Sequence, residues 1–461
     1  MSIVTIALEK VDFLPPDRVT DDTSILTLKN MVLEPFCRWE DGSFRPGLFS
    51  HWTCENEARR WRFHIRPDAV FHDGKPAVAE DVLAFISAII ASVDTFGMKW
   101  SYARYFERTR FSAHSDSEID VEMVEPFGDL PEVFSEFFLC RLASDGKPVL
   151  GTGPYRVAEF DGPGRVLLER NSGSGPERML VVAERSADIR FASLKSGAID
   201  VALNLERMDG RIDFDPAFHW GRAVNTLSIM CYLNCFQGIF KTPEARLAIN
   251  YAVDVPGIID GLFQGLGVPS GSIVSPHHLG SKVAALSPIP FDPDKAKALF
   301  EQAGLDGPIL IRTPEFMPEK AVEICQVIGQ SLAAIDVPAI LDIQPDRPAY
   351  AREVSAGKIG DMAIFDSSPH STYRVLNDKI SSRTKALWWQ GFIDPELEDL
   401  IANANRSVTE FDREQAYGRC LVRLNQNPPW LYLFHPVNVF ASQKKSGFFS
   451  IDSKGVLRVF P

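Results

Sequence analysis

Short stretches of the chain alternate between polar and apolar residues, the pattern of a half-buried β-strand. Residues 60–66 are the clearest example, because their three large apolar side chains fall on one face: Trp61, Phe63 and Ile65. Residues 3–8 are rich in β-branched side chains and predict a first strand. Further strands are predicted over 157–160 and 165–170, on either side of a Gly-Pro-Gly turn, and over 338–344 and 362–365.

Longer segments carry apolar positions at helical spacing. The helices predicted in this way cover 23–32, 79–93, 243–254, 292–304, 317–334, 394–405 and 409–427. A further helix begins at 190 and is stopped by Gly197, before a strand that ends at 203. Helices and strands alternate along the chain, and this order predicts an α/β protein.

Composition and charge limit the classes of function that the protein can have. The chain has 461 residues, of which 45% are hydrophobic and 24% charged, as in a globular protein long enough for two lobes. The net charge of −13 disfavours nucleic acid and anionic membrane surfaces as partners. No apolar run approaches the roughly 20 residues of a membrane helix, so we predict no membrane insertion. The opening residues MSIVTIALEK lack the basic segment of a signal peptide, so the protein is cytosolic or its signal has been removed.

Candidate metal and catalytic residues do not fall at the spacings that such chemistry requires. The seven cysteines are an odd number, and Cys231 and Cys235 have no histidine partner at zinc spacing. The sequence lacks the HExxH and GxSxG motifs of hydrolases. The adjacent His277 and His278 are interpreted as part of a loop. We therefore predict no metal and no cofactor, and a metal-dependent hydrolase is the least favoured function.

His72 and Asp73, in the sequence FHDGKPAVAEDV at 71–82, resemble the start of a metal or acid/base site. An Asp-Gly pair, however, favours the backbone angles of a tight turn. Glu80 and Asp81 then fall in the first turn of the predicted helix, where the helix dipole favours acidic groups. The stretch is therefore interpreted as a turn that leads into a helix, a scaffold rather than a reactive site.

Several segments, taken in order, resemble the motifs of one protein family. They are Asn30–Pro35 and Arg45–Trp52, Trp61–Arg66 with Phe71–Val82, Gly151–Tyr155 with Leu168–Asn171, Leu194–Asp200, and Ala248–Asp254. This series is similar to that of the extracellular solute-binding proteins of the peptide/nickel-binding type, which serve ABC importers. One departure is Val78, where the family usually has a threonine that would cap the following helix.

The resemblance implies a fold and a mechanism of ligand binding. It implies two α/β lobes around a cleft, with a subdomain inserted into the first lobe. The core of lobe I would comprise residues 1–32, 150–225 and 436–461, the inserted subdomain 33–149, and lobe II 226–435. Ligands of the family are engulfed as the lobes close, a motion carried by a few hinge residues.

The resemblance also suggests a ligand-binding arginine. Arg141 precedes the Gly-Thr-Gly-Pro-Tyr sequence at 151–155, and the nickel-binding branch has a similarly placed arginine that holds a ligand carboxylate. A guanidinium suits a carboxylate because it donates two parallel hydrogen bonds. An ion pair within the protein is the alternative for Arg141. The glycines at 151–155 lack the lysine of a phosphate loop and are interpreted as a tight crossing of the chain.

A polar loop follows the strand at 362–365, and ligands of open α/β sheets sit at the carboxyl ends of strands. Its candidate ligand-binding residues are Asp366, which would face a cation, and His370, Tyr373 and Arg374. The family's peptide binders place Gly-Trp and an acidic group here and its nickel binders Trp and Tyr, so this sequence leaves both specificities in doubt. The remaining candidates are the amide of Asn234 and four aromatic residues that could form cleft walls, Trp100, Tyr102, Trp388 and Trp389.

Arginine and aspartate among these candidates suit a zwitterion. The resemblance to the solute-binding family implies a periplasmic, monomeric binding protein without catalytic activity. It would capture an amino-acid-derived compound, an opine or a short peptide and deliver it to an ABC transporter permease. A metal- or metallophore-binding receptor of the same fold and a cytosolic solute sensor are the alternatives.

Overall fold

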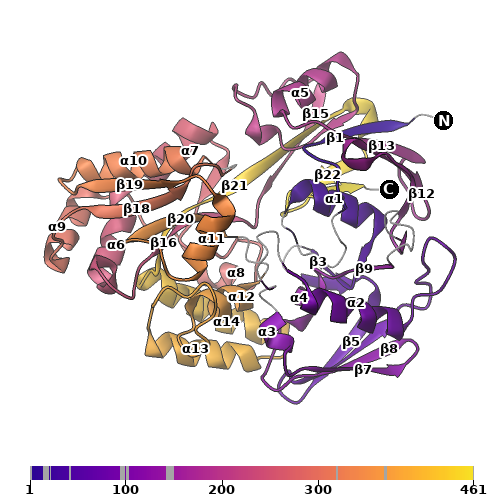
Figure 1. Ribbon diagram of the computed structural model, residues 1–461, viewed down its shortest axis with the longest axis horizontal. Helices are drawn as coiled ribbons and strands as arrows, with labels where there is room; N and C mark the ends of the chain where they lie inside the picture. The colour runs from indigo at the N-terminus through magenta and orange to yellow at the C-terminus, as the bar shows by residue number, and fades with distance from the viewer. Residues whose placement is uncertain are drawn as a thin grey trace. The chain divides into compact units, whose positions relative to one another are not determined.

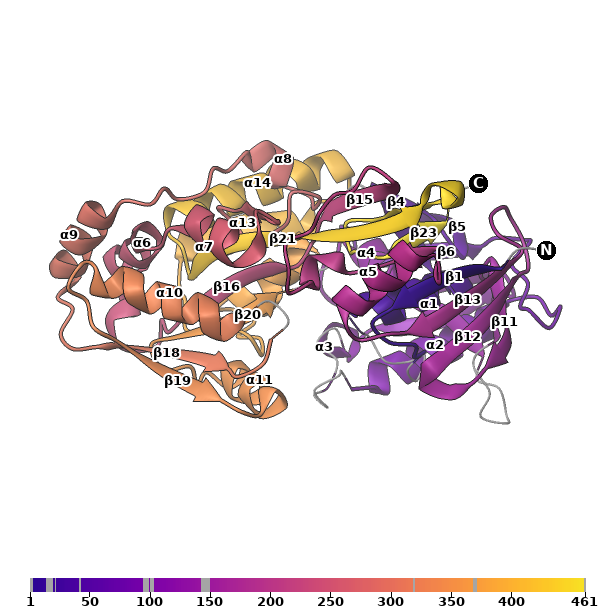
Figure 2. The same ribbon diagram turned by 90° about the horizontal axis from the view of Figure 1, so that it is seen from above.

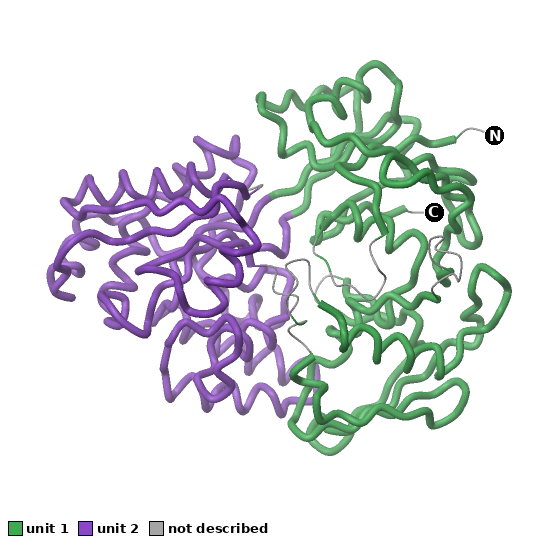
Figure 3. The backbone as a smooth tube through the Cα atoms, viewed as in Figure 1, with its two compact units in different colours: residues 1–223, 437–461 green, residues 224–436 purple. Residues whose placement is uncertain are grey.

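The computed structural model describes residues 3–13, 20, 22–40, 43–93, 99, 103–141, 150–317, 320–367 and 371–459. The chain forms two compact units: residues 1–223 with 437–461 make up unit 1, and residues 224–436 make up unit 2 (Figure 3). Both units are mixed α/β structures, as predicted. The finer division into a lobe core and an inserted subdomain stays a prediction. Within the described ranges, none of the helices has the length and apolarity needed to cross a membrane.

The main sheet of unit 1 is built around the first strand of the chain (Figure 1). β1 (Val4–Leu8) pairs in parallel with β13 (Arg178–Ala183) on one side and with β14 (Val201–Ala202) on the other. Beyond β13, the sheet continues through β12 (Arg165–Arg170) and β11 (Tyr155–Phe160) with antiparallel pairing. These two strands flank the short helix at 162–164, where the sequence predicted a turn.

Helices of unit 1 start and stop at recognisable residues. α1 (Thr23–Val32) begins after Asp22, whose carboxylate accepts a hydrogen bond from the backbone N–H of Ile25 (3.1 Å). α5 (Ala187–Ser196) ends at Gly197, which adopts the left-handed conformation with φ 77°. Such a cap and such a stop are the preferred local signals of helix ends, and the predicted stop at Gly197 is confirmed.

A second sheet of unit 1 has four antiparallel strands in the order β5-β6-β8-β7. Its strands are β5 (Phe49–Glu55), β6 (Arg60–Ile65), β8 (Glu118–Glu122) and β7 (Arg110–Ser115). Trp61, Phe63 and Ile65 of β6 are buried, as their alternation predicted. The other elements of unit 1 are α2 (Ala79–Ala91), α3 (Ala103–Phe106), α4 (Leu130–Phe134), β2 (Glu34–Pro35), β3 (Cys37–Glu40), β4 (Ser43–Pro46), β9 (Phe138–Arg141), β10 (Leu150–Gly151), β15 (Phe218–Val224), β22 (Phe449–Ile451) and β23 (Leu457–Val459).

Unit 2 has its own sheet, in the order β21-β16-β20-β18-β19. The strands are β21 (Trp430–Gln443), β16 (Ser228–Leu233), β20 (Met362–Ser367), β18 (Ile309–Pro314) and β19 (Ala339–Gln344). β18 runs parallel to both of its neighbours, whereas β16 is antiparallel to β20 and β21. β17 (Gly267–Pro269) adds a short antiparallel pairing with β21.

Helices cover both faces of this sheet. Ile311 of β18 belongs to a core that also contains residues of α6 (Pro243–Ala252), α7 (Val255–Phe263), α9 (Pro293–Ala303) and α10 (Ala321–Ala333). The next residue, Arg312, points to the opposite face and bonds Glu353 of α11 (Arg347–Ser355) at 2.7 Å. Figure 2 shows α10 and α11 on opposite sides of β18 and β19. Unit 2 also contains α12 (Thr372–Arg374), the π-helical segment η4 (Val375–Ile380), α13 (Pro395–Arg406), α14 (Glu410–Gln426), the short α8 (Ser281–Ala284) and the 3-10 turn η3 (Ile239–Lys241).

β21 is fourteen residues long and belongs to both units. Near its start Trp430 pairs with Tyr232 of β16 in unit 2, and near its end Ala441 pairs with Ala202 of β14 in unit 1. The chain therefore passes between the units twice, at 223–224 and again at 436–437.

Candidate functional site

Arg141, the predicted carboxylate-binding arginine, is held between an acid and an aromatic ring in unit 1. It ends β9, and its Nε and Nη2 donate to the two carboxylate oxygens of Asp81 at 2.8 and 2.7 Å. Its guanidinium carbon lies 4.1 Å from the centre of the Phe71 ring. The hydrogen bonds that Arg141 donates to Asp81 raise the pKa of Arg141. The guanidinium is therefore charged and fixed in orientation by residues of the same unit.

Asp81 has a second role at the start of α2. One of its oxygens accepts the backbone N–H of Val78 at 3.0 Å. Val78 occupies the N-cap position, where an apolar side chain cannot accept a hydrogen bond. The carboxylate three residues later instead satisfies the N–H of the cap residue, which is half of a capping box. This contact helps explain how the helix starts without the expected threonine.

His72 and Asp73 confirm the turn interpretation. The backbone N–H of His72 donates to the Gly151 carbonyl, and its ring Nε2 lies 3.0 Å from the Gly153 carbonyl oxygen. Asp73 accepts the N–H of Lys75 at 3.1 Å, as an aspartate does in a tight turn. Burial lowers the pKa of His72, which keeps the ring neutral. Among the described residues, no group of three or more metal-ligating side chains gathers here or elsewhere.

The glycines of the 151–155 segment allow it to approach α1. A Cβ placed on Gly151 would lie 2.1 Å from the carbonyl oxygen of Val32, and one on Gly153 would lie 2.5 Å from the Val32 carbonyl carbon. The Phe71–Asp81 segment thus supports both Arg141 and the glycine crossing that follows it. Its function is to position these groups.

We expect Asp81→Asn to lower the free energy of unfolding by about 1–2 kcal/mol, because an amide cannot accept both charge-assisted hydrogen bonds of Arg141. Chemical denaturation monitored by circular dichroism measures the change. The matched control is Asp120→Asn, since Asp120 makes a similar two-bond pair with Arg62 in the same unit (2.7 and 3.1 Å). The Arg62 side chain is more exposed than that of Arg141, at 38% against 28%, so solvent screens its pair more and the loss should be smaller. Equal losses in the two variants would contradict the role given to Asp81.

Asp366, the candidate cation-facing acid of unit 2, lies near the carboxyl end of β20. Its carboxylate is 2.7 Å from Nη2 of Arg347, the first residue of α11. A cation in the first turn of a helix is disfavoured by the helix dipole, so Asp366 offsets this unfavourable position. The cation beside Asp366 in this structure is therefore a side chain of the protein.

The segment that follows β20 carries two further candidates. Tyr373 is buried, and Arg374 lies beside Asp378, with 3.5 Å between Nε and a carboxylate oxygen. The hydroxyl of Ser371 caps α12 by accepting the N–H of Arg374 at 2.9 Å. His370 lies outside the described residues, as do Trp100 and Tyr102.

Asn234 and Trp389 are engaged by the backbone. The side-chain amide of Asn234 donates to the Gly360 carbonyl at 2.7 Å, and its oxygen accepts the N–H of Phe236 at 3.1 Å. The indole N–H of Trp389 donates to the Phe392 carbonyl at 2.7 Å. Both contacts fix local turns, and a ligand role for these two residues stays a prediction.

Trp388 lies in an aromatic group on the second face of the unit 2 sheet. Its ring is nearly parallel to that of Tyr232, at 11° with 6.2 Å between centroids, and lies 5.2 Å from the ring of Phe365. Lys379, on η4, donates to the Tyr232 hydroxyl at 2.7 Å. Arg374, Asp366 and Asp378 are close enough to affect the ionisation of the same phenol. The structure thus brings Trp388 together with Asp366 and Arg374 around Tyr232.

Sequence reasoning missed Tyr232, Arg347 and Lys379. For Arg347 a signal existed: Asp346 and Pro348 flank it directly after the predicted strand at 338–344, the residue types of a helix start. Helix starts after parallel strands lie at the same sheet edge as the end of β20. No pattern in the sequence indicated that Lys379 would lie on a π-helical turn.

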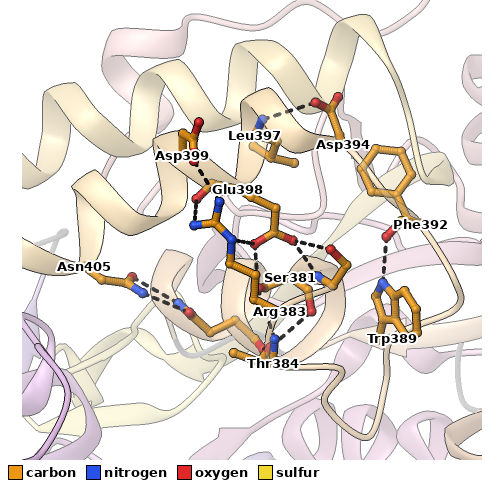
Figure 4. Close-up of polar contacts among 12 residues, drawn as sticks. Ser381, Arg383, Thr384, Trp389, Phe392, Asp394, Leu397, Glu398, Asp399 and Asn405 are labelled. Carbon is orange, nitrogen blue, oxygen red and sulfur yellow. Dashed lines mark hydrogen bonds and ion pairs between the residues drawn. The ribbon is translucent and has the colours of Figure 1, made fainter.

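A buried carboxylate holds this part of the chain in place (Figure 4). Glu398 of α13 accepts from the hydroxyls of Ser381 and Ser382, both at 2.9 Å, and from the backbone N–H of Ser382 at 2.5 Å. Asn377 and Asn405 exchange two amide hydrogen bonds of 3.1 and 2.9 Å. These contacts tie the segment that carries Lys379 and Trp388 to α13.

Two α/β units linked by two crossings of the chain have the architecture of a two-lobed binding protein. The model of the family described as bacterial extracellular solute-binding proteins, family 5, matches residues 43–373. The chain belongs to this family, and it is a solute-binding protein of the kind that serves ABC importers. The family predicted from the sequence motifs is confirmed.

Individual relatives differ in what they bind. The chain is 23% identical to the nickel-binding periplasmic protein of Escherichia coli, over 91% of this chain and 86% of that protein. It is 24% identical to the dipeptide-binding protein of Pseudomonas aeruginosa, over 92% and 87% respectively. Its fold is similar to that of AgaA from A. tumefaciens in complex with agropinic acid, with a TM-score of 0.78 and 21% identity over 100% of this chain and 99% of that one.

Proposed function

We propose that this protein captures a small zwitterionic solute, such as an amino-acid-derived compound, an opine or a short peptide, and delivers it to an ABC transporter permease. The observation that carries the proposal is the gathering of both charge signs around Tyr232. Asp366 and Asp378 supply negative charge there, and Arg374 and Lys379 supply positive charge. A zwitterion needs one partner of each sign, and the aromatic rings beside them suit its apolar part.

The relatives support the same chemical class. Dipeptides are zwitterions, and AgaA is in complex with agropinic acid, a carboxylic acid. Arg141 of unit 1 adds a fixed guanidinium whose Nη1 makes no hydrogen bond with the described residues. A periplasmic location, a monomeric state and the lack of catalytic activity belong to the same proposal, because the named relatives are binding proteins.

Isothermal titration calorimetry tests the ligand class directly. We expect heat of binding from at least one member of a panel of dipeptides, opines and free amino acids. A neutral oligosaccharide serves as the comparison ligand, because it offers hydroxyls but no charge. Binding of the oligosaccharide at about micromolar affinity, with no heat from any zwitterion, would contradict the proposal.

A further inference from the structure

The Lys379 ammonium and the Tyr232 hydroxyl form a pair of hydrogen-bond donors. The ammonium nitrogen is 2.7 Å from the hydroxyl oxygen and 5.4 Å from the centre of the Tyr232 ring. Because a phenol oxygen lies outside the ring on a line through its centre, both distances are met when the ammonium lies beyond the hydroxyl rather than above the ring. The hydroxyl therefore accepts from Lys379, so its own proton points away from the ammonium.

The Tyr232 hydroxyl keeps its proton. The residue is buried, with 1% of its surface exposed, and burial raises the pKa of the phenol well above its ordinary value. A neutral hydroxyl next to an ammonium offers one O–H and one charged N–H to the same region. Two donors side by side match the two oxygens of a carboxylate.

The backbone that carries Lys379 is unusual. Residues 375–380 form a π-helix, and the N–H of Ser381 donates to the Leu376 carbonyl, five residues earlier, at 2.8 Å. π-Helical turns are rare and occur frequently at functional sites. Asn377 compensates by donating its amide to the Tyr373 carbonyl at 3.0 Å, and Thr384 donates to the Asn377 carbonyl at 2.7 Å. The neighbouring structure thus maintains a conformation that an ordinary helix would not adopt.

We propose that Lys379 and Tyr232, beside the Trp388 ring, form the subsite of unit 2 that receives a carboxylate of the solute. Lys379 and Tyr232 are the binding groups, and Trp388, with its ring centre 5.2 Å from the ammonium, forms the adjacent wall. Glu398 acts as a positioning residue, because it anchors the segment between them through Ser381 and Ser382. This inference rests on the proposed function. It identifies the carboxylate as the part of the solute that unit 2 recognises.

Fluorine NMR on protein labelled with 5-fluorotryptophan tests the subsite with acetate as the probe. The Trp388 resonance is assigned with Trp388→Phe, and sodium chloride controls for ionic strength. We expect acetate to shift the Trp388 resonance in a saturable way and to leave that of Trp389 unchanged. The Trp389 ring is a matched control, because its centre lies 5.8 Å from the ammonium of Lys385. Lys379→Met should abolish the response, whereas Lys385→Met should preserve it.

Titration with L-alanyl-L-alanine and its C-terminal amide separates the subsite from solute binding in general. Lys379→Met should weaken the acid by about tenfold to a hundredfold, as expected for the loss of a charge-assisted hydrogen bond, and change the amide little. Glu398→Gln should reduce the preference for acid over amide, a ratio that a purely structural role would leave unchanged even if the melting temperature fell.

Two results would overturn the subsite: no acetate response at Trp388 in the wild-type protein, or the same response in Lys379→Met. If acid and amide bind equally to the wild-type protein and to Lys379→Met, the subsite is wrong while solute binding stands. If neither dipeptide form nor any other zwitterion binds, yet acetate acts at Trp388 through Lys379, the proposed function fails while the anion subsite stands.

Discussion

Gly151→Ala should lower the free energy of unfolding by about 3 kcal/mol, at the upper end of the range for overpacking a dense interior. The added Cβ would lie 2.1 Å from the carbonyl oxygen of Val32 and 2.7 Å from a methyl carbon of Leu33. The first of these neighbours is backbone at the end of α1, so it cannot turn aside as a flexible side chain can. Either α1 or the crossing segment must move. Denaturant unfolding followed by circular dichroism measures the loss.

Gly164→Ala is the matched control for this prediction. Gly164 also lies in unit 1, in the turn between β11 and β12, and apart from its neighbours in the chain no atom of the described residues lies within 4 Å of a Cβ built there. Alanine at such a position reduces the freedom of the unfolded chain, so the change should be neutral or stabilising by up to about 1 kcal/mol. A loss in Gly151→Ala no larger than that in Gly164→Ala would contradict the close packing described for the crossing segment.

Acid should destabilise the protein through His435. This residue of β21 is 1% exposed, and its Nδ1 lies 2.9 Å from the Leu227 carbonyl oxygen, to which it donates. Burial is the largest influence and lowers the pKa of His435 to about 4, with His277 adding to the effect. Protonation would place a charge in a buried site, where hydrogen bonds with the backbone at Leu227 and Ser272 offset only part of the cost of desolvation.

The direction of this change in unfolding free energy follows from which state of the chain binds the proton at a higher pH. Below a pH of about 6.5 the unfolded chain protonates this histidine, while the folded chain does so only near pH 4, so acid favours the unfolded chain across that interval. The difference between the two pKa values corresponds to a loss of at most about 3 kcal/mol, complete near pH 4. Unfolding free energies measured from neutral pH down to that point should fall less steeply in His435→Gln. His219→Gln, at an exposed position, should retain the wild-type slope, and a wild-type slope in His435→Gln would show that another group is responsible.

Local signals predicted the regular elements well. Residues 23–32 form α1 as predicted, and the predicted helices over 79–93, 243–254, 292–304, 394–405 and 409–427 exist as α2, α6, α9, α13 and α14 with ends shifted by a few residues. The helix predicted from 317 begins only at Ala321, and that predicted from 190 begins at Ala187. Helix boundaries depend on capping residues, and the spacing of apolar residues does not identify them.

Elements fixed by tertiary contacts were missed. α7, α11 and the long β21 were not predicted, and neither was the π-helical turn. β21 is apolar over most of its length because helices cover both faces of its sheet in unit 2, so it lacks the alternation of a half-buried strand. The π-helical turn is held by Asn377, Thr384 and Glu398, and the last of these lies in another helix.

The candidate site was predicted in part. Arg141, Asp366, Arg374 and Trp388 were chosen from a resemblance and from their position after a strand, and the structure shows the internal partner of each. Asp81 and Arg347 supply two of those partners from 60 and 19 positions away in sequence. Ion pairs between residues so far apart in sequence produce no periodic pattern, so only the folded structure identifies them.

β21 also bears on the order in which the protein can be assembled during synthesis. Residues 430–434 pair with β16 of the unit 2 sheet, and residues 441–442 pair with a strand formed more than two hundred positions earlier. The first 223 residues therefore leave the ribosome well before the strand that their sheet requires. Contacts between such distant segments form slowly, so neither unit can complete its sheet until residues 430–442 have been synthesised, and both depend on this same stretch of polypeptide.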